Sequence, residues 1–309
     1  MMLQELVNRF TTVSIVGVDV GSALIKVVEL ARSDGQPILQ RCGIARVEGD
    51  DAASLLKRLC ADAGITTTNA ALGLAAPGLV VKSFQVPSMP RKELKSALQL
   101  EAEQAILNGH ALNQMASDWH VIQSPTKVSI RGLLAVVPKT ILDTRLHMAA
   151  AAGLRPTVVD VEGLALWNAY WVLVGSRELV PQTVLLMNIG VRMTTIVVAK
   201  GPDELMLVRD VQLGGSALAE GQQREWITEV QDSLGYARSQ SGLRTLDAVY
   251  VTGGGSDPKL IPLLKTAVNA PLTFWNPLNQ LPRGASAIVE ESVGPLLAVA
   301  IGLALRQPS

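Results

Sequence analysis

The first part of the chain carries β-rich apolar runs separated by turn residues. Residues 13–20 (VSIVGVDV) and 23–30 (ALIKVVEL) are joined at a Gly-Ser turn and predict a β-hairpin. A third run, residues 37–48, follows another turn, so the three runs predict an antiparallel meander. Leu55, Leu59 and Ala63 then share one face of a predicted helix.

The same order recurs in the second half of the chain. Residues 183–190 (TVLLMNIG) and 193–201 (MTTIVVAKG) predict another hairpin with glycine at its turn, and residues 205–215 predict the third strand. A polar break at 175–178 separates the two halves. An internal repeat of strand, glycine turn, strand and strand predicts two similar lobes.

The segment between the first meander and the break has a different pattern. A charged helix from residue 91, two strand-like runs and a helix ending at Gly153 predict an inserted subdomain over about residues 90–153. We therefore predict a first lobe over residues 1–183, which contains the insert, and a second lobe over 184–309. The closing apolar helix, 295–306, would pack back on the first lobe.

Composition narrows the function classes. The 309 residues are 48% hydrophobic, enough for two α/β lobes with buried cores. Lys plus Arg and Asp plus Glu both number 27 and form no basic run, so we expect no nucleic-acid partner. Cys42 and Cys60 lack metal-ligand spacing and fit a reducing cytoplasm. The apolar run 295–305 is shorter than the roughly 20 residues that cross a bilayer, so membrane contact is expected only through partners.

The first hairpin turn is a candidate phosphate site. In DVGSALIK, residues 19–26, a tight glycine turn exposes backbone N–H groups that can cradle phosphate, and Asp19 could hold magnesium through water. Ordinary hairpin chemistry accounts for an Asp-x-Gly turn as well. The candidates in this turn are Asp19, Gly21, Ser22, Ala23 and Lys26.

Two further glycine segments belong with this turn. NIGVRMTT, residues 188–195, is the matching turn of the second lobe, and two facing turns would grip a polyphosphate from both sides. VTGGGS, residues 251–256, ends a strand and opens onto a helix, where the backbone can approach a base and ribose. The candidates here are Asn188, Gly190, Thr194, Gly253, Gly254, Gly255 and Ser256, with Gly214 and Gly215 at the end of RDVQLGG.

In this order, the three segments resemble the phosphate-1, phosphate-2 and adenosine motifs of the actin/Hsp70/sugar-kinase superfamily. The resemblance implies an α/β, two-lobed actin-like ATPase fold with ribonuclease H-like lobes. DVEGLALWNAY, residues 160–170, is similar to the connecting helix of that superfamily, which implies that Glu162 orients water or metal. Stabilisation by the helix dipole accounts for Glu162 equally well.

Within the superfamily the chain resembles the PilM family of type IV pilus assembly proteins. The residues that carry the resemblance are VGVDVGSALIKVVEL, EAEQAIL, DVEGLALWNAY, RDVQLGG, VTGGGS and AVAIGLALR. Asn188 stands where the family usually carries Asp, which removes one anionic metal ligand. The stretch from Gly215 to Trp226 is shorter than the helical subdomain that relatives carry over the adenine.

The resemblance implies a cytoplasmic scaffold, peripheral at the inner membrane, with ATP and Mg²⁺ as cofactors and at most a very weak ATPase activity. Its expected partners are the tail of a PilN-like bitopic inner-membrane protein, held in a groove between the first lobe and the insert, and other proteins of a pilus or secretion platform. One alternative is a slow ATPase or a sugar-kinase-like enzyme. Another is a filament-forming protein like FtsA or MreB, which ATP-dependent polymerisation would distinguish.

Overall fold

The first lobe contains a five-stranded sheet of mixed direction. The computed structural model describes residues 14–306 except 34, 50, 106–111 and 127. The strands of the first sheet are β1 (Ile15–Val20), β2 (Leu24–Ser33), β3 (Gln36–Arg46), β4 (Asn69–Leu74) and β8 (Arg155–Val161). Their order is β3-β2-β1-β4-β8, with the first three antiparallel and β4 and β8 added in parallel. The predicted meander is therefore confirmed.

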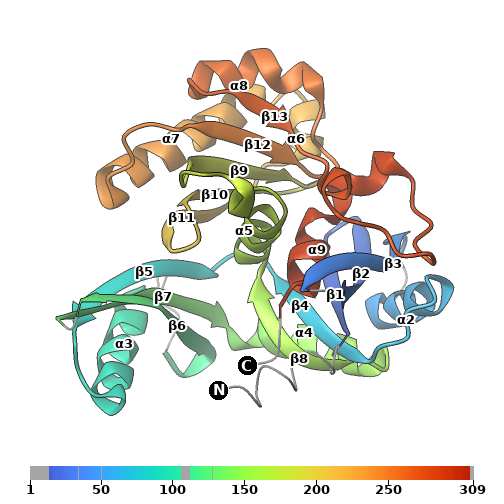
Figure 1. Ribbon diagram of the computed structural model, residues 1–309, viewed down its shortest axis with the longest axis horizontal. Coiled ribbons are helices and arrows are strands. Elements are labelled where there is room, and N and C mark those ends of the chain that lie inside the picture. The colour runs from blue at the N-terminus through green and yellow to red at the C-terminus, as the bar shows by residue number, and fades with distance from the viewer. Residues whose placement is uncertain (1–13, 34, 50, 106–111, 127, 307–309) are drawn as a thin grey trace.

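The second sheet repeats this arrangement. Its strands are β9 (Thr183–Ile189), β10 (Thr194–Lys200), β11 (Glu204–Val211), β12 (Ala248–Thr252) and β13 (Leu272–Phe274). The order β11-β10-β9-β12-β13 again combines an antiparallel meander with two parallel strands. The fold is the predicted α/β, two-lobed actin-like ATPase fold, with the two sheets in the lower right and upper parts of Figure 1.

Helices cover the outer face of each sheet. The helices are α2 (Ala52–Asp62) and α4 (Lys139–Ala151) in the first lobe and α6 (Gly215–Ala219), α7 (Gln223–Ser241) and α8 (Ile261–Ala267) in the second. Leu56 and Ala149 pack against Val16 and Val18 of β1 in one buried cluster. The corresponding cluster of the second lobe places Trp226 and Leu264 against β9 and β10. Alternate strand residues point to opposite faces, so each sheet has a second apolar face to bury.

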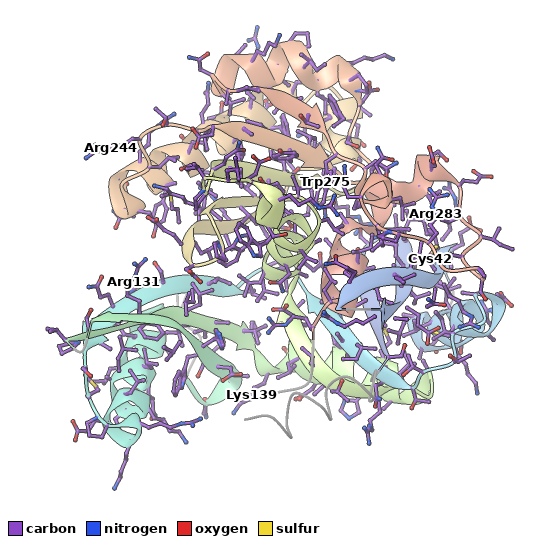
Figure 2. All side chains as sticks on the ribbon, in the orientation of Figure 1. Cys42, Arg131, Lys139, Arg244, Trp275 and Arg283 are labelled. Atoms are coloured by element: carbon purple, nitrogen blue, oxygen red, sulfur yellow. The ribbon has the colours of Figure 1, made fainter. Side chains whose placement is uncertain are left out.

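Two helices bury the inner faces of both sheets together. α5 (Glu162–Leu173) follows the first sheet but contacts β9, β10 and β11, whereas α9 (Ala298–Ala304) follows the second sheet and contacts β1, β2 and β4. The ring centroid of Tyr170 in α5 lies 4.8 Å from that of Tyr250 and 6.1 Å from that of Trp275. Figure 2 labels Trp275. A Cβ atom on Gly302 would collide with the backbone of Ala165, so α5 and α9 touch directly. One core therefore spans both lobes.

A third, smaller sheet lies beside the first lobe. It is formed by β5 (Val80–Pro87), β6 (Met115–Thr126) and β7 (Ser129–Pro138) in the order β5-β7-β6, with α3 (Arg91–Ala105) packed on it. Because β5 pairs with β7, this sheet begins at Val80, before the predicted boundary near residue 90. α4, which the same prediction placed in the insert, packs on the first sheet instead. Strand pairing between distant segments is not readable from local pattern, which accounts for the difference.

Short 3₁₀ helices complete the chain. They are η1 (Leu112–Gln114), η2 (Gly175–Arg177), η3 (Pro258–Leu260), η4 (Pro277–Asn279) and η5 (Glu291–Leu297). The predicted closing helix is thus split into η5 and α9. Within the part of the chain that the structure describes, no helix is long and apolar enough to cross a membrane.

Candidate functional site

The first glycine turn brings a carboxylate and an ammonium group together. Gly21 donates its backbone N–H to the carbonyl of Leu24 at 2.9 Å and closes the β1–β2 hairpin. Asp19 and Lys26 are register partners in this hairpin, so their side chains project from the same face. Lys26 Nζ lies 2.9 Å from Asp19 Oδ2, and Asp19 is only 3% exposed.

The second turn has the same backbone geometry, but the register pair beside it is neutral. Gly190 donates its N–H to the carbonyl of Met193 at 2.8 Å. Asn188 and Thr195 are the register partners here, and both Asp19 and Asn188 stand one residue before the end of their strand. Thr195 Oγ1 donates to Asp210 Oδ1 at 2.8 Å, which connects this turn to β11.

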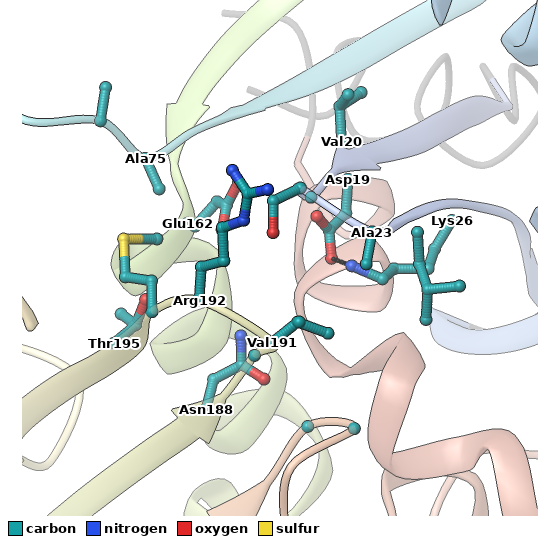
Figure 3. Close-up of a pocket in the computed structure, with 18 of the residues that line it drawn as sticks. Asp19, Val20, Ala23, Lys26, Ala75, Glu162, Asn188, Val191, Arg192 and Thr195 are labelled. Carbon is teal, nitrogen blue, oxygen red and sulfur yellow. Dashed lines mark hydrogen bonds and ion pairs between the residues drawn. The ribbon is translucent and has the colours of Figure 1, made fainter. Parts of the chain in front are cut away.

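Both turns line one cavity of about 330 Å³. Figure 3 shows Asp19 and Lys26 on one side of it and Asn188, Val191 and Arg192 on the other. Ten candidate residues line this cavity: Asp19, Gly21, Ser22, Ala23, Lys26, Glu162, Asn188, Gly190, Gly253 and Gly254. The geometry predicted from the paired motifs, two glycine turns and a glycine run at one crevice, is therefore present.

Five other candidates do not line the cavity: Thr194, Gly214, Gly215, Gly255 and Ser256. Thr194 is fully buried, because strand alternation turns it away from the cavity; its Oγ1 donates to the carbonyl of Leu213 and accepts from Trp226 Nε1. A Cβ on Gly214 would lie 2.5 Å from the carbonyl oxygen of Gly190, so the backbone of Gly214 packs directly against the second turn. Ser256 Oγ donates to the carbonyl of Gly253 at 2.6 Å. These residues shape the backbone of the site.

Four polar residues of the cavity wall were not predicted: Arg145, Arg192, Thr195 and Gln212. Arg145 reaches the first turn from α4, where Nη2 donates to the carbonyl of Val20 at 2.8 Å. No local signal pointed to it, since α4 is far from the turn in sequence. Arg192 and Thr195 lie inside the NIGVRMTT motif, and strand alternation would have favoured Thr195 over Thr194.

Glu162 is a buried carboxylic acid between the two lobes. It is 6% exposed at the first turn of α5. Burial and then the carboxylate of Asp19 raise its pKa, the ammonium of Lys26 lowers it, and the net result is a pKa of about 8. Burial also raises the pKa of Asp210, against the hydrogen bond from Thr195. Glu162 can therefore hold a proton near neutral pH.

The protein side chains do not fit a magnesium site. Asp19 is the candidate carboxylate ligand in the first turn, but its Oδ2 is ion-paired with Lys26. The matching position in the second lobe is Asn188, which carries a neutral amide. Among the residues described, no group of three His, Cys, Asp or Glu side chains is arranged to hold a metal ion. The sequence-based assignment of Asp19 as a metal ligand stays a prediction, and the ion pair of Asp19 with Lys26 argues against it.

A repeated sheet, two connecting helices and a cavity between paired glycine turns define an actin-like protein of two lobes. The family model described as type IV pilus assembly protein PilM matches residues 17–229, and the chain belongs to this family. The resemblance drawn from the sequence motifs is confirmed.

The chain is also similar to solved structures. It is similar to a structure described as the PilM-PilN type IV pilus biogenesis complex, with a TM-score of 0.79, 23% identity, and coverage of 96% of this chain and 98% of that one. A Bacteroides thetaiotaomicron protein with an actin-like ATPase fold matches with a TM-score of 0.49, 10% identity and coverage of 84% and 90%. The cytoplasmic domain of EpsL from the Vibrio cholerae type II secretion system matches with a TM-score of 0.48, 13% identity and coverage of 94% of both chains.

Proposed function

We propose that this protein is a cytoplasmic scaffold of a type IV pilus assembly platform, and that it binds the cytoplasmic tail of a PilN-like inner-membrane protein. The observation that carries the proposal is the likeness, over 96% of the chain, to a structure described as a PilM-PilN complex. Membership of the PilM family supports the same role. The partner's membrane span would hold the scaffold at the inner membrane.

We place the tail where β8 meets the insert. β8 is the last strand of the first sheet and pairs only with β4 among the described strands, so we expect an extended peptide to pair with its other edge. Val158 of β8, Val81 of β5 and Ile122 of β6 are partly buried and pack against the core cluster that also holds Leu133 of β7. An extended tail with apolar side chains can therefore pair with the strand edge and use the same apolar surface.

The cavity between the lobes is the proposed nucleotide site, with the paired turns holding phosphates. A nucleotide that contacts both turns would favour a closed arrangement of the lobes, since only that arrangement brings both turns to the ligand. Such coupling amounts to about 1–3 kcal/mol in typical allosteric proteins. This is sufficient to change the affinity for the tail, and no hydrolysis is required.

A peptide titration tests the scaffold. A synthetic peptide with the sequence of the PilN-like protein's cytoplasmic tail is titrated into the purified chain by calorimetry. Val158→Glu places a charge on the apolar surface beside β8, and we expect it to weaken binding by at least about tenfold. Leu179→Glu is the matched control, because Leu179 is fully exposed in the segment between η2 and β9. Lack of binding by the wild type, or equal binding by both variants, would refute the proposed location or partner.

Two assays distinguish the scaffold from the alternatives. A slow ATPase or a sugar-kinase-like enzyme would release phosphate or transfer it with steady turnover. A filament-forming protein of the FtsA or MreB kind would increase light scattering when ATP is added. For the scaffold we expect no polymer in isolation and tail binding that does not require turnover.

A further inference from the structure

Cations outnumber carboxylates in the wall of the cavity. Of its charged side chains, Lys26, Arg145 and Arg192 are basic, whereas Asp19 and Glu162 are acidic. The negative charge of Asp19 is already balanced by Lys26 at 2.9 Å. The wall therefore favours an anionic ligand even before any counter-ion is added.

The two arginines reach the cavity from opposite lobes. Arg145 is held in place by its bond to the carbonyl of Val20 in the first turn and keeps further N–H donors for a ligand. Arg192 is an exposed residue of the second turn and extends toward Asp19 and Glu162 in Figure 3. Among the described residues, no carboxylate forms an ion pair with Arg192. A planar guanidinium can bind phosphate oxygens in a bidentate manner.

The same wall disfavours a divalent cation. Magnesium in phosphate sites is usually held by one or two carboxylates together with the substrate phosphates. Here Asp19 already pairs with an ammonium group, and a metal beside it would be repelled by Lys26 at short range. Asn188, at the matching position of the second lobe, offers only a neutral oxygen.

We propose that the cavity binds the phosphates of a nucleoside di- or triphosphate directly through Arg192, Arg145 and Lys26, without Mg²⁺. The inference rests on the proposed nucleotide site and concerns its chemistry. The cations take the place that a metal ion occupies in a magnesium-dependent site, and the glycine turns supply backbone N–H groups. Binding should therefore be insensitive to chelators and sensitive to salt.

The test is a titration of fluorescently labelled ATP into the full chain, once in excess magnesium and once in EDTA. We expect the two dissociation constants to agree within about threefold. A loss of about tenfold or more in EDTA would overturn the inference while leaving a nucleotide site in place. Absence of binding in both buffers would refute the inference and the nucleotide site together. The tail-peptide titration would still test the proposed scaffold function independently.

Single-residue variants test which side chains bind the phosphates. Arg192→Ala should weaken binding about tenfold in both buffers, because it removes charge-assisted hydrogen bonds to phosphate. Arg224→Ala, an exposed site on α7 outside the cavity wall, is the matched control and should leave binding unchanged.

A gain of metal dependence provides the converse test. Asn188→Asp adds a carboxylate to the cavity, so binding in EDTA should weaken about tenfold and magnesium should restore it. Equal binding by this variant in both buffers, or an unchanged affinity of Arg192→Ala, would contradict the proposal.

Discussion

The two lobes repeat one backbone with different side-chain chemistry. Each has a hairpin closed by a glycine N–H bond, and each places a polar residue one position before the end of the inner strand. In the first lobe this residue is Asp19, paired with Lys26, whereas in the second it is Asn188, opposite Thr195. The backbone of the turn is repeated, because glycine and strand pairing determine it. The charge of the side chains beside the turn differs between the lobes.

The lobes also differ in how the connecting helix approaches the inner strand. Two residues before Asp19 lies Gly17, where an added Cβ would collide with the backbone of Ala300 in α9. Two residues before Asn188 lies Leu186, a fully buried side chain that belongs to the shared core. The first lobe therefore obtains close backbone contact with α9, whereas the second fills the same position with a side chain.

The largest expected effect comes from removing this difference at Gly17. Gly17→Ala should lower the free energy of unfolding by about 3 kcal/mol or more, because α9 must move away from β1. Urea unfolding followed by circular dichroism measures the change. Gly235→Ala is the control: this helical glycine in α7 has open space around it, so alanine should stabilise by about 0.5–1 kcal/mol. A loss below about 0.5 kcal/mol for Gly17→Ala would show that the contact with α9 is not tight.

Next in size is the pH dependence contributed by Glu162, which lies between the carboxylates of the two lobes. Its pKa is raised from 4.5 to about 8 on folding, so the folded state binds the proton more tightly than the unfolded state. The contribution is full below about pH 4.5 and is lost as pH rises through about 8. Glu162→Gln cannot ionise and should be more stable than the wild type at pH 8, by on the order of 2 kcal/mol, but similar near pH 4.5.

Unfolding midpoints measured across this pH range, in EDTA and without nucleotide, test the prediction. Glu225→Gln, an exposed site on α7, is the control and should keep the pH profile of the wild type. Parallel profiles for the wild type and Glu162→Gln would contradict a protonated Glu162.

The coupling energy between Asp19 and Lys26 in the first lobe should exceed that between Asn188 and Thr195 in the second. A double-mutant cycle with Asp19→Asn and Lys26→Met should give a coupling energy of about 1–2 kcal/mol, since the side chains are only 4% and 13% exposed. The cycle with Asn188→Ala and Thr195→Val should give less than about 0.5 kcal/mol. Equal coupling in the two cycles would remove the distinction between the turns.

The smallest effect is expected at an ion pair outside the cavity. Arg209 Nη2 and Glu229 Oε2 in the second lobe are 2.7 Å apart, but their side chains are 39% and 40% exposed. A double-mutant cycle should give less than about 0.5 kcal/mol and decrease with added salt. A coupling as large as that of Asp19 and Lys26 would mean that exposure does not decide the difference.

Much of the fold could be predicted because its signals are local. The hairpins, their glycine turns and the repeat depend on the pattern of consecutive residues. The motif VTGGGS ends a strand as expected. The membership of β5 in the small sheet was missed, because a strand's partner lies far along the chain. Arg145 was missed for the same reason, since α4 reaches the first turn only after folding.

The amino-acid sequence by itself determined the two glycine turns, the meanders and the polar residues beside them, since turn type and strand pattern depend on neighbouring residues. Only the tertiary structure decided which of these polar groups meet. It buried Glu162 between Asp19 and Asp210, turned Thr194 into the core, and placed Arg145 and Arg192 at one cavity. The physical reason is that burial and charge balance depend on contacts between segments that are distant in the chain.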